Sequence, residues 1–228
     1  MLGYSICYLQ FYEVSKSQNE TPQTQNSISP QTPYLSVIAS NTGKKVLPID
    51  QSIQPALDII AECAETLLAE MNAPDSPAKG HARINEVSRL FENSLQKKLN
   101  IHPDFACEFP QTIKGKTQRS GFPDLVIRYR PNNRYIYLDP KLYEETSQDS
   151  TLRTFYYTPR KETSKILENA HHLLLGFAHD GKDGDWTFTN WHLLDLSKLT
   201  LNYKGEYNAS NRDLYQAEHL IRSRSESL

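Results

Sequence analysis

The segment SGFPDLVIRYRPNNRYIYLDPKLY, residues 120–143, decides the fold of this chain. It holds two apolar runs rich in β-branched and aromatic residues, and the PNN at 131–133 between them is typical of a tight turn. The segment therefore predicts a β-hairpin. Residues symmetric about the turn lie opposite each other in a hairpin, so we expect Asp124 and Asp139 to face each other. Alternation places Lys141 on the same side of its strand as Asp139. Two carboxylates and one amine are thus predicted to converge at one edge of a sheet.

The sequence on both sides of the hairpin predicts a mixture of helices and strands. Apolar residues recur at helical spacing over 53–71 and again over 84–99. The remaining predicted elements are strands at 106–113, 172–179 and 187–196, a strand or short buried run at 34–40, a polar loop at 144–151, and helices over 159–170 and 212–222. This order predicts an α/β or α+β domain with a central mixed β-sheet flanked by helices.

A polar, proline-interrupted stretch, SQNETPQTQNSISPQTP at 17–33, predicts a linker or a long loop. We therefore divide the chain into an N-terminal region, residues 1–78, and a domain at 79–228 that carries the hairpin. The predicted helix at 53–71 belongs to the first of these. We expect the N-terminal region to serve dimerisation or to grip a ligand.

Size and cysteine content favour an ordinary protein of the reducing cytosol. The chain has 228 residues, of which 38% are hydrophobic, which suits one domain or one domain with an appendage. The three cysteines, Cys7, Cys63 and Cys107, form no CxxC pair, so neither a disulfide framework nor a zinc ribbon is indicated. The apolar start, MLGYSICYLQFY, is too short to span a bilayer and lacks the positive charge of a signal peptide. We expect a cytoplasmic protein with no membrane partner.

The net charge of −2 conceals an uneven distribution. Residues 1–78 hold three Lys and Arg against eight Asp and Glu, whereas residues 111–165 hold eleven against six. A basic excess around a few acids is what a site for a polyanion with metal chemistry needs. A solvated surface stretch shows the same excess by chance, so charge alone decides nothing.

The predicted trio of Asp124, Asp139 and Lys141 suits phosphodiester hydrolysis. Hard oxygen ligands hold Mg²⁺, which polarises the phosphoryl oxygens and helps to generate a hydroxide nucleophile. A lysine beside it orients the water and stabilises the developing charge. Pro140 lacks a backbone donor, but its carbonyl oxygen remains available to the metal.

At this point the residues resemble a known family. Pro123-Asp124, followed after fifteen residues by Asp139-Pro140-Lys141, is similar to the PD-(D/E)xK signature of the nuclease superfamily that includes most type II restriction endonucleases. The resemblance implies a restriction-endonuclease-like core and in-line attack that leaves 5′-phosphate and 3′-hydroxyl ends. It also assigns Glu86 to the acidic position that many members carry on the first core helix. The stretch at 152–181 resembles, more loosely, the blunt-cutting dimeric branch of these enzymes.

Several competing assignments remain open. A second Asp-x-Lys triplet, Asp180-Gly-Lys182, lies in a glycine-rich turn without a strand pattern. Glu92 shares a helix with Glu86, and Glu108 is a reserve ligand. The histidines have no zinc spacing, which favours structural roles for them; they are His171, His172 and His179.

Basic residues on either side of the acids predict contacts with DNA phosphates. These residues are Lys114, Lys116, Arg119, Arg153, Arg160, Lys161 and Lys165. The polar stretch at 202–213 offers side chains that can address base edges, and we assign Asn208, Asn211 and Arg212 to base readout. For each of them an exposed turn or a solvated face is the competing interpretation.

Together these features predict a Mg²⁺-dependent endonuclease that cuts double-stranded DNA, of type II restriction character. Because palindromic sites are read by two-fold symmetric proteins, we expect a homodimer. The alternatives are a structure-specific repair or recombination nuclease of the same fold, and a DNA-binding protein whose motif is inert.

Overall fold

The computed structural model describes residues 31–151, 153–203 and 207–224, without the side chains of 153 and 154. Six strands form one sheet in the order β10-β7-β6-β4-β3-β2. Their bounds are β2 Phe105–Glu108, β3 Leu125–Tyr129, β4 Arg134–Glu144, β6 Ala170–His179, β7 Phe188–Asp195 and β10 Leu220–Ser223. All neighbours are antiparallel except β4 and β6, which run parallel. The predicted mixed sheet is therefore confirmed.

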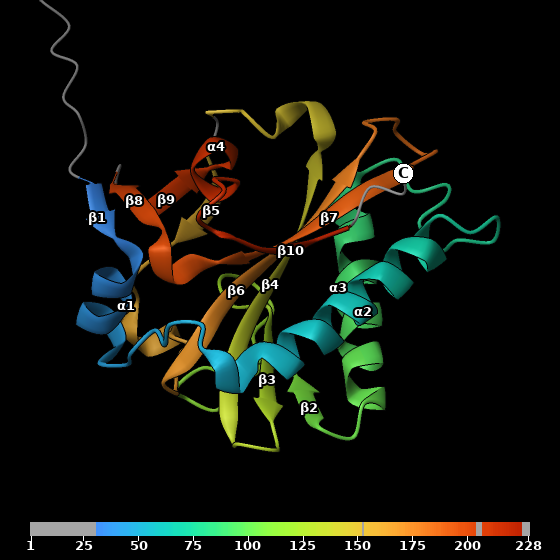
Figure 1. Cartoon of the computed structure of the whole chain (residues 1–228). Coiled ribbons are helices and arrows are strands. Elements are labelled where there is room, and N and C mark those ends of the chain that lie inside the picture. The colour runs from blue at the N-terminus through green and yellow to red at the C-terminus, as the bar shows by residue number, and fades with distance from the viewer. Residues whose placement is uncertain (1–30, 152, 204–206, 225–228) are drawn as a thin grey trace, which may run out of the picture.

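Two long helices cover one face of this sheet, as Figure 1 shows. They are α2, Gln54–Met71, and α3, Ile84–Ile101, and both were predicted from apolar spacing. Their apolar sides join side chains from one face of the sheet in a single hydrophobic cluster. Phe91 of α3 contacts the rings of Phe177 and Phe188, at centroid distances of 4.8 and 4.7 Å. The helix from the N-terminal region thus packs into the same core as the helix that follows it.

A smaller sheet and a short helix lie against the opposite face (Figure 1). The small sheet has the order β1-β8-β9-β5, and its strands are β1 Gln31–Pro33, β5 Arg153–Tyr157, β8 Thr200–Tyr203 and β9 Tyr207–Ser210. The helix is α1, Tyr34–Thr42. Strand β6 shows how both faces are filled: Leu173 and Leu175 join the cluster under α2 and α3, while Leu174 joins the second cluster. With helices on one side and a sheet on the other, all ten residues of β6 are buried.

The run at 34–40 is a helix, α1, and not a strand. Tyr34, Val37 and Ile38 are buried whereas Leu35 is exposed, so the buried positions follow helical spacing. Gly43, with a φ of 71°, ends the helix in the left-handed conformation that glycine adopts without strain. The helical spacing of the buried residues therefore decided the structure of this run, although its β-branched residues favour a strand.

The predicted helix over 159–170 is also wrong. Only one short 3-10 turn, Lys161–Thr163, forms there. The backbone amides of Leu167 and Glu168 donate to the Tyr137 hydroxyl, at 2.8 and 3.0 Å, so a tertiary contact replaces helical hydrogen bonds. The connection between β4 and β6 therefore passes through β5 of the small sheet.

The tail predicted as a helix over 212–222 forms a single turn and then a strand. Helix α4 spans Asn211–Leu214 and begins with a capping box between Ser210 and Asp213. Strand β10 then pairs with β7, because the edge of the large sheet takes up its backbone hydrogen bonds.

Part of the predicted linker forms a strand. The end of the predicted linker at 17–33 is β1, which pairs with β8, while residues 17–30 lie outside the described part of the chain. Within that part, no helix is both long and apolar enough to cross a membrane.

Candidate active site

The hairpin of β3 and β4 brings the two predicted carboxylates together. Leu125 pairs with Leu138 at the end of the ladder, so Asp124, directly before β3, lies across from Asp139 in β4. Both aspartates are buried, with 7% and 1% of their surface exposed. The register follows from the turn at 131–133, in which Asn133 adopts a φ of 58°.

Lys141 completes the cluster from the same strand. Its Nζ lies 3.0 Å from Oδ2 of Asp139 and 3.4 Å from Oδ2 of Asp124. Burial alone would lower the pKa of the ammonium, but the two carboxylates raise that pKa above its ordinary value. Lys141 is therefore charged at neutral pH and partly neutralises the acid pair.

Asp124 and Asp139 cannot both carry a full charge at low energetic cost in this setting. Burial is the main cause that raises the pKa of Asp124, to about 8, and the neighbouring Asp139 raises it further, while Lys141 acts in the opposite direction. A cation placed between the two carboxylates would remove this repulsion.

One atom of the pair shows that such a cation fits. Oδ1 of Asp139 is buried and has no hydrogen-bond partner. A buried carboxylate oxygen normally accepts a hydrogen bond or binds a metal. In the described part of the chain no three His, Cys, Asp or Glu side chains gather as a ready metal cage. The donor set of two carboxylates suits Mg²⁺, which keeps several waters and takes other ligands from phosphate.

Pro140 lies between Asp139 and Lys141 without breaking the sheet. The β3–β4 ladder ends at Leu138, whereas β4 continues alongside β6 as far as Glu144. Over this stretch β4 has lost its β3 neighbour, and a strand that is open on one side tolerates proline. The carbonyl of Pro140 remains a predicted metal ligand.

The acid on α3 that lies near the site is Glu92, not Glu86. Glu86 is in the exposed first turn of α3, where it pairs with His81 at 3.2 Å. Glu92 has only 15% of its side chain exposed, and its charge contributes to the raised pKa of Asp124. Both glutamates are helical in the sequence, and only the packing of α3 separates them.

The residues predicted to contact DNA phosphates differ in whether they already bond to other groups of the protein. Arg119 is already engaged, because its guanidinium donates to Glu92 and Asn93 and lies 4.2 Å from the centre of the Phe109 ring. Lys165 is buried and donates from Nζ to the carbonyls of Gln118 and Gly121. Lys114, Lys116, Arg160 and Lys161 are exposed, and the side chain of Arg153 lies outside the described part of the chain.

The residues assigned to base readout are mostly not on the surface. Asn208 and Asn211 are each 3% exposed, and the Asn211 amide donates to the carbonyl of Ser147. Arg212 is exposed and donates to the carbonyl of Asp149. The two asparagines therefore cannot reach a base in this conformation, because α4 packs Asn211 against the loop after β4.

Of the neighbouring histidines, His172 behaves as a structural residue, whereas both ring nitrogens of the buried His171 lack a hydrogen-bond partner within the described part of the chain. His172 is buried, and its Nδ1 is 2.8 Å from the hydroxyl of Tyr34. Burial lowers the pKa of His172 to about 3, so the ring is neutral. Among the described residues, these rings are not part of a metal-binding cluster.

Comparison with known proteins gives two matches. The model of the type II restriction enzyme MjaV family matches residues 28–218. The type II restriction enzyme MjaV of Methanocaldococcus jannaschii is 32% identical over 193 residues, which cover 79% of this chain and 83% of that protein. The region matched by the family model contains the β3–β4 hairpin, the small sheet and every strand of the large sheet except β10.

Proposed function

The chain belongs to the MjaV family of type II restriction enzymes, which are site-specific deoxyribonucleases, and on this premise we propose that it cuts double-stranded DNA with Mg²⁺ at Asp124, Asp139 and Lys141. The observation that carries the proposal is the buried, unpartnered Oδ1 of Asp139 beside a second carboxylate and a lysine. Membership in the family confirms the resemblance to restriction endonucleases.

In this proposal the two aspartates hold the metal, with the carbonyl of Pro140 as a further ligand. Bound there, Mg²⁺ supplies Lewis acidity toward the phosphate and lowers the pKa of water. Asp124 must give up its proton to act as a ligand, since burial and Asp139 raise its pKa.

Lys141 has a separate role next to the acids. Its ammonium lies between both carboxylates and is one-third exposed, so it reaches the position where a water and a phosphate would meet. There it would orient the attacking water and stabilise negative charge on the phosphoryl group as that charge develops. Glu92 would act through its charge and through Arg119, which holds it near the site.

The direct test uses long duplex DNA with Mg²⁺. Sequence-specific cutting gives discrete fragments with 5′-phosphate ends, and replacement of Asp124 by alanine abolishes them. Cleavage confined to branched or nicked DNA would favour a structure-specific nuclease instead. If the wild type never nicks any plasmid, and the Asp124→Ala variant binds DNA equally well, the motif is inert.

We also infer that the active form is a homodimer, because a two-fold symmetric site is read by a two-fold symmetric protein. Light scattering on the free protein and on its complex with a cleavable duplex measures the mass directly. A complex that contains one chain per duplex would contradict the dimer.

A further inference from the structure

A cavity of about 290 Å³ lies beside the acid pair. Its walls come from residues 118, 120–122 and from the connection at 156–158, 160 and 163–165. Phe122 of the first wall lies two residues before Asp124, and Lys165 of the second wall interacts electrostatically with Asp124 and Asp139, so the cavity is close to the predicted metal site. Its volume is several times the roughly 30 Å³ that a water molecule takes up in the liquid, so a phosphate group with its waters fits.

The lining of this cavity is basic and rich in hydroxyls, and no Asp or Glu lines it. Arg160 and Lys165 supply the positive charge, and Ser120, Thr158 and Thr163 supply hydroxyls. This composition contrasts with the acid pair close by. A lining that offers cations and hydroxyl donors, and no acids, is suited to bind phosphate oxygens.

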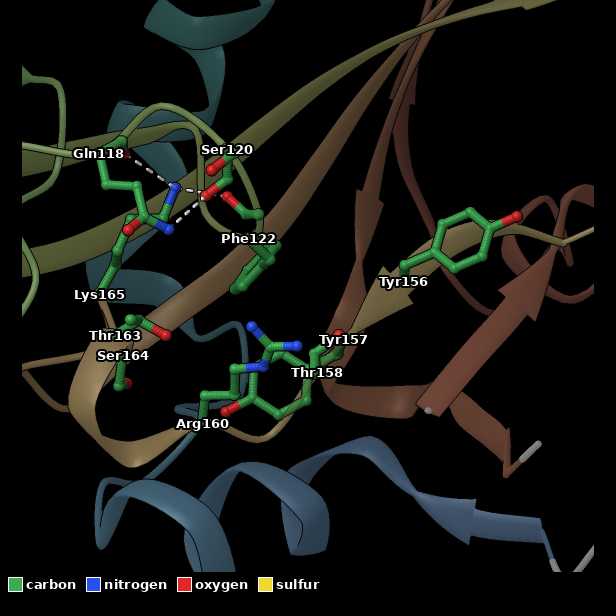
Figure 2. A pocket seen from close by; sticks show the side chains of 11 residues that line it. Gln118, Ser120, Phe122, Tyr156, Tyr157, Thr158, Arg160, Thr163, Ser164 and Lys165 are labelled. Atoms are coloured by element: carbon green, nitrogen blue, oxygen red, sulfur yellow. Dashed lines mark hydrogen bonds between the residues drawn. The ribbon is translucent and has the colours of Figure 1, made fainter. Parts of the chain in front are cut away.

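Arg160 has the donors that a phosphate would need. Figure 2 shows its side chain reaching across the cavity toward Phe122. The guanidinium makes no hydrogen bond or ion pair with any described residue, so all five of its N–H donors are free for a ligand.

Lys165 is the fixed counterpart in the wall. Its ammonium, which Figure 2 shows turned toward the 118–121 segment, donates to the carbonyls of Gln118 and Gly121. No carboxylate of the described residues lies within ion-pair distance of it. Burial lowers the pKa of Lys165, and the more distant Asp124 and Asp139 only partly oppose this. A buried ammonium without an ion pair is unfavourable unless an anion approaches it.

We propose that this cavity binds a backbone phosphate of the DNA strand next to the scissile phosphate, with Arg160 as its main ligand and Lys165 as a fixed charge in the wall. The inference rests on the proposed function, because it takes DNA as the substrate. The neighbouring carboxylates repel a free anion, so the ligand is a phosphate already tethered to the strand. Successive phosphates of one strand are spaced by about 3.4 Å along the helix axis, which allows both subsites to be filled by one strand.

The first test measures binding of a short duplex without metal, so that cleavage plays no part. Replacing Arg160 by alanine should weaken binding by about tenfold at moderate salt and reduce the slope of log K against log salt by about one. Arg160→Lys keeps the charge and should keep the slope.

Arg128→Ala is the matched control, because Arg128 is an exposed arginine of β3 outside the cavity. A slope for Arg160→Ala equal to that of the wild type overturns the proposal. Arg160 is chosen over Lys165 because loss of Lys165 would also release the 118–121 segment.

The second test removes the charge of one phosphate at a time with methylphosphonate substitutions around the cleavage site. A methylphosphonate at one position should slow DNA cleavage by the wild type and have no further effect on cleavage by Arg160→Ala. If no position behaves in this way, the cavity does not hold a phosphate. A rise in 2-aminopurine fluorescence on binding, with an unchanged salt slope, would instead assign the cavity to a base turned out of the duplex. Failure of the wild type to cut any duplex would contradict the proposed function, while the salt slope would still decide about the cavity.

Discussion

The chain contains the triplet Asp-x-Lys twice, and the two copies have opposite surroundings. In Asp139-Pro140-Lys141 the lysine lies 3.0 Å from an aspartate whose side chain is 2% exposed, and a second carboxylate adjoins both. In Asp180-Gly181-Lys182 the ion pair is similar in length, 3.2 Å, but the aspartate is 17% exposed, and the lysine is 73% exposed against 33% for Lys141. The first copy lies within β4, whereas the second directly follows the neighbouring strand β6, so the two differ in their position relative to the sheet.

The second triplet is a turn stabilised by its own backbone. Oδ1 of Asp180 accepts hydrogen bonds from the amides of Lys182 and Thr187, and Gly181 takes a φ of 76°. None of its side-chain nitrogen or oxygen atoms is both buried and without a hydrogen-bond partner. In the first triplet one carboxylate oxygen is buried without a partner. The distance within an ion pair therefore says little about function, whereas burial and an unsatisfied oxygen say much more.

Removal of one aspartate from each triplet should give the largest difference between them. Asp139→Asn should lower DNA cleavage by about 10³-fold or more, because a metal ligand is lost. Asp180→Asn should leave cleavage within about twofold, since asparagine keeps the side-chain oxygen that accepts the hydrogen bonds of the turn. Single-turnover rates with saturating enzyme measure both, and circular dichroism checks the folding. Equal losses in the two variants would show that the triplets do not differ in function.

The lysines should show a smaller contrast. Lys141→Met removes a cation that stabilises charge in the transition state, so we expect a loss of about 10²-fold in rate with little change in DNA affinity. Lys182→Met should behave as the wild type. Separate measurement of rate and affinity is decisive: a loss confined to affinity would make Lys141 a binding residue only.

The two glutamates of α3 allow a similar comparison outside the two triplets. Glu92→Gln should raise the Mg²⁺ concentration needed for half-maximal cleavage by about tenfold, as for other groups that act behind the metal ligands. Glu86→Gln, an exposed change on the same helix, is the matched control and should have no effect. The reverse result would restore Glu86 as the acidic partner.

The smallest effect is on stability, and it has opposite signs at the two triplets. Burial and Asp139 raise the pKa of Asp124, so the folded protein binds more protons than the unfolded chain between about pH 4 and pH 8. In metal-free buffer, the melting temperature of the wild type should therefore fall relative to Asp124→Asn as the pH rises through this window.

Asp180 should show the reverse dependence. Its slight burial would raise its pKa, but hydrogen bonds from Thr187 and Lys182 outweigh this and lower the pKa below its ordinary value. Its stabilising contribution is present above the unfolded pKa and is lost as the pH falls. Calorimetry of Asp124→Asn and Asp180→Asn across the same buffers compares the signs, and a parallel response would contradict the assignment of the two environments.

Local sequence determined the hairpin and its site. Symmetry about a short turn fixes which residues of two adjoining strands are opposite, and alternation fixes their faces, so Asp124, Asp139 and Lys141 could be placed together without knowledge of the rest. The helices α2 and α3 were predictable for a similar reason, because their apolar spacing repeats over five turns.

Only the tertiary structure decided the elements whose hydrogen bonds end far away in the chain. The Tyr137 hydroxyl accepts hydrogen bonds from the amides of Leu167 and Glu168, so no helix forms there. The tail pairs with the free edge of β7 and therefore becomes strand β10. Packing also placed the charge of Glu92 where it acts on Asp124, left Glu86 exposed and buried Asn208. Such choices depend on which surfaces meet across the fold, and residue type and spacing along the chain do not contain that information.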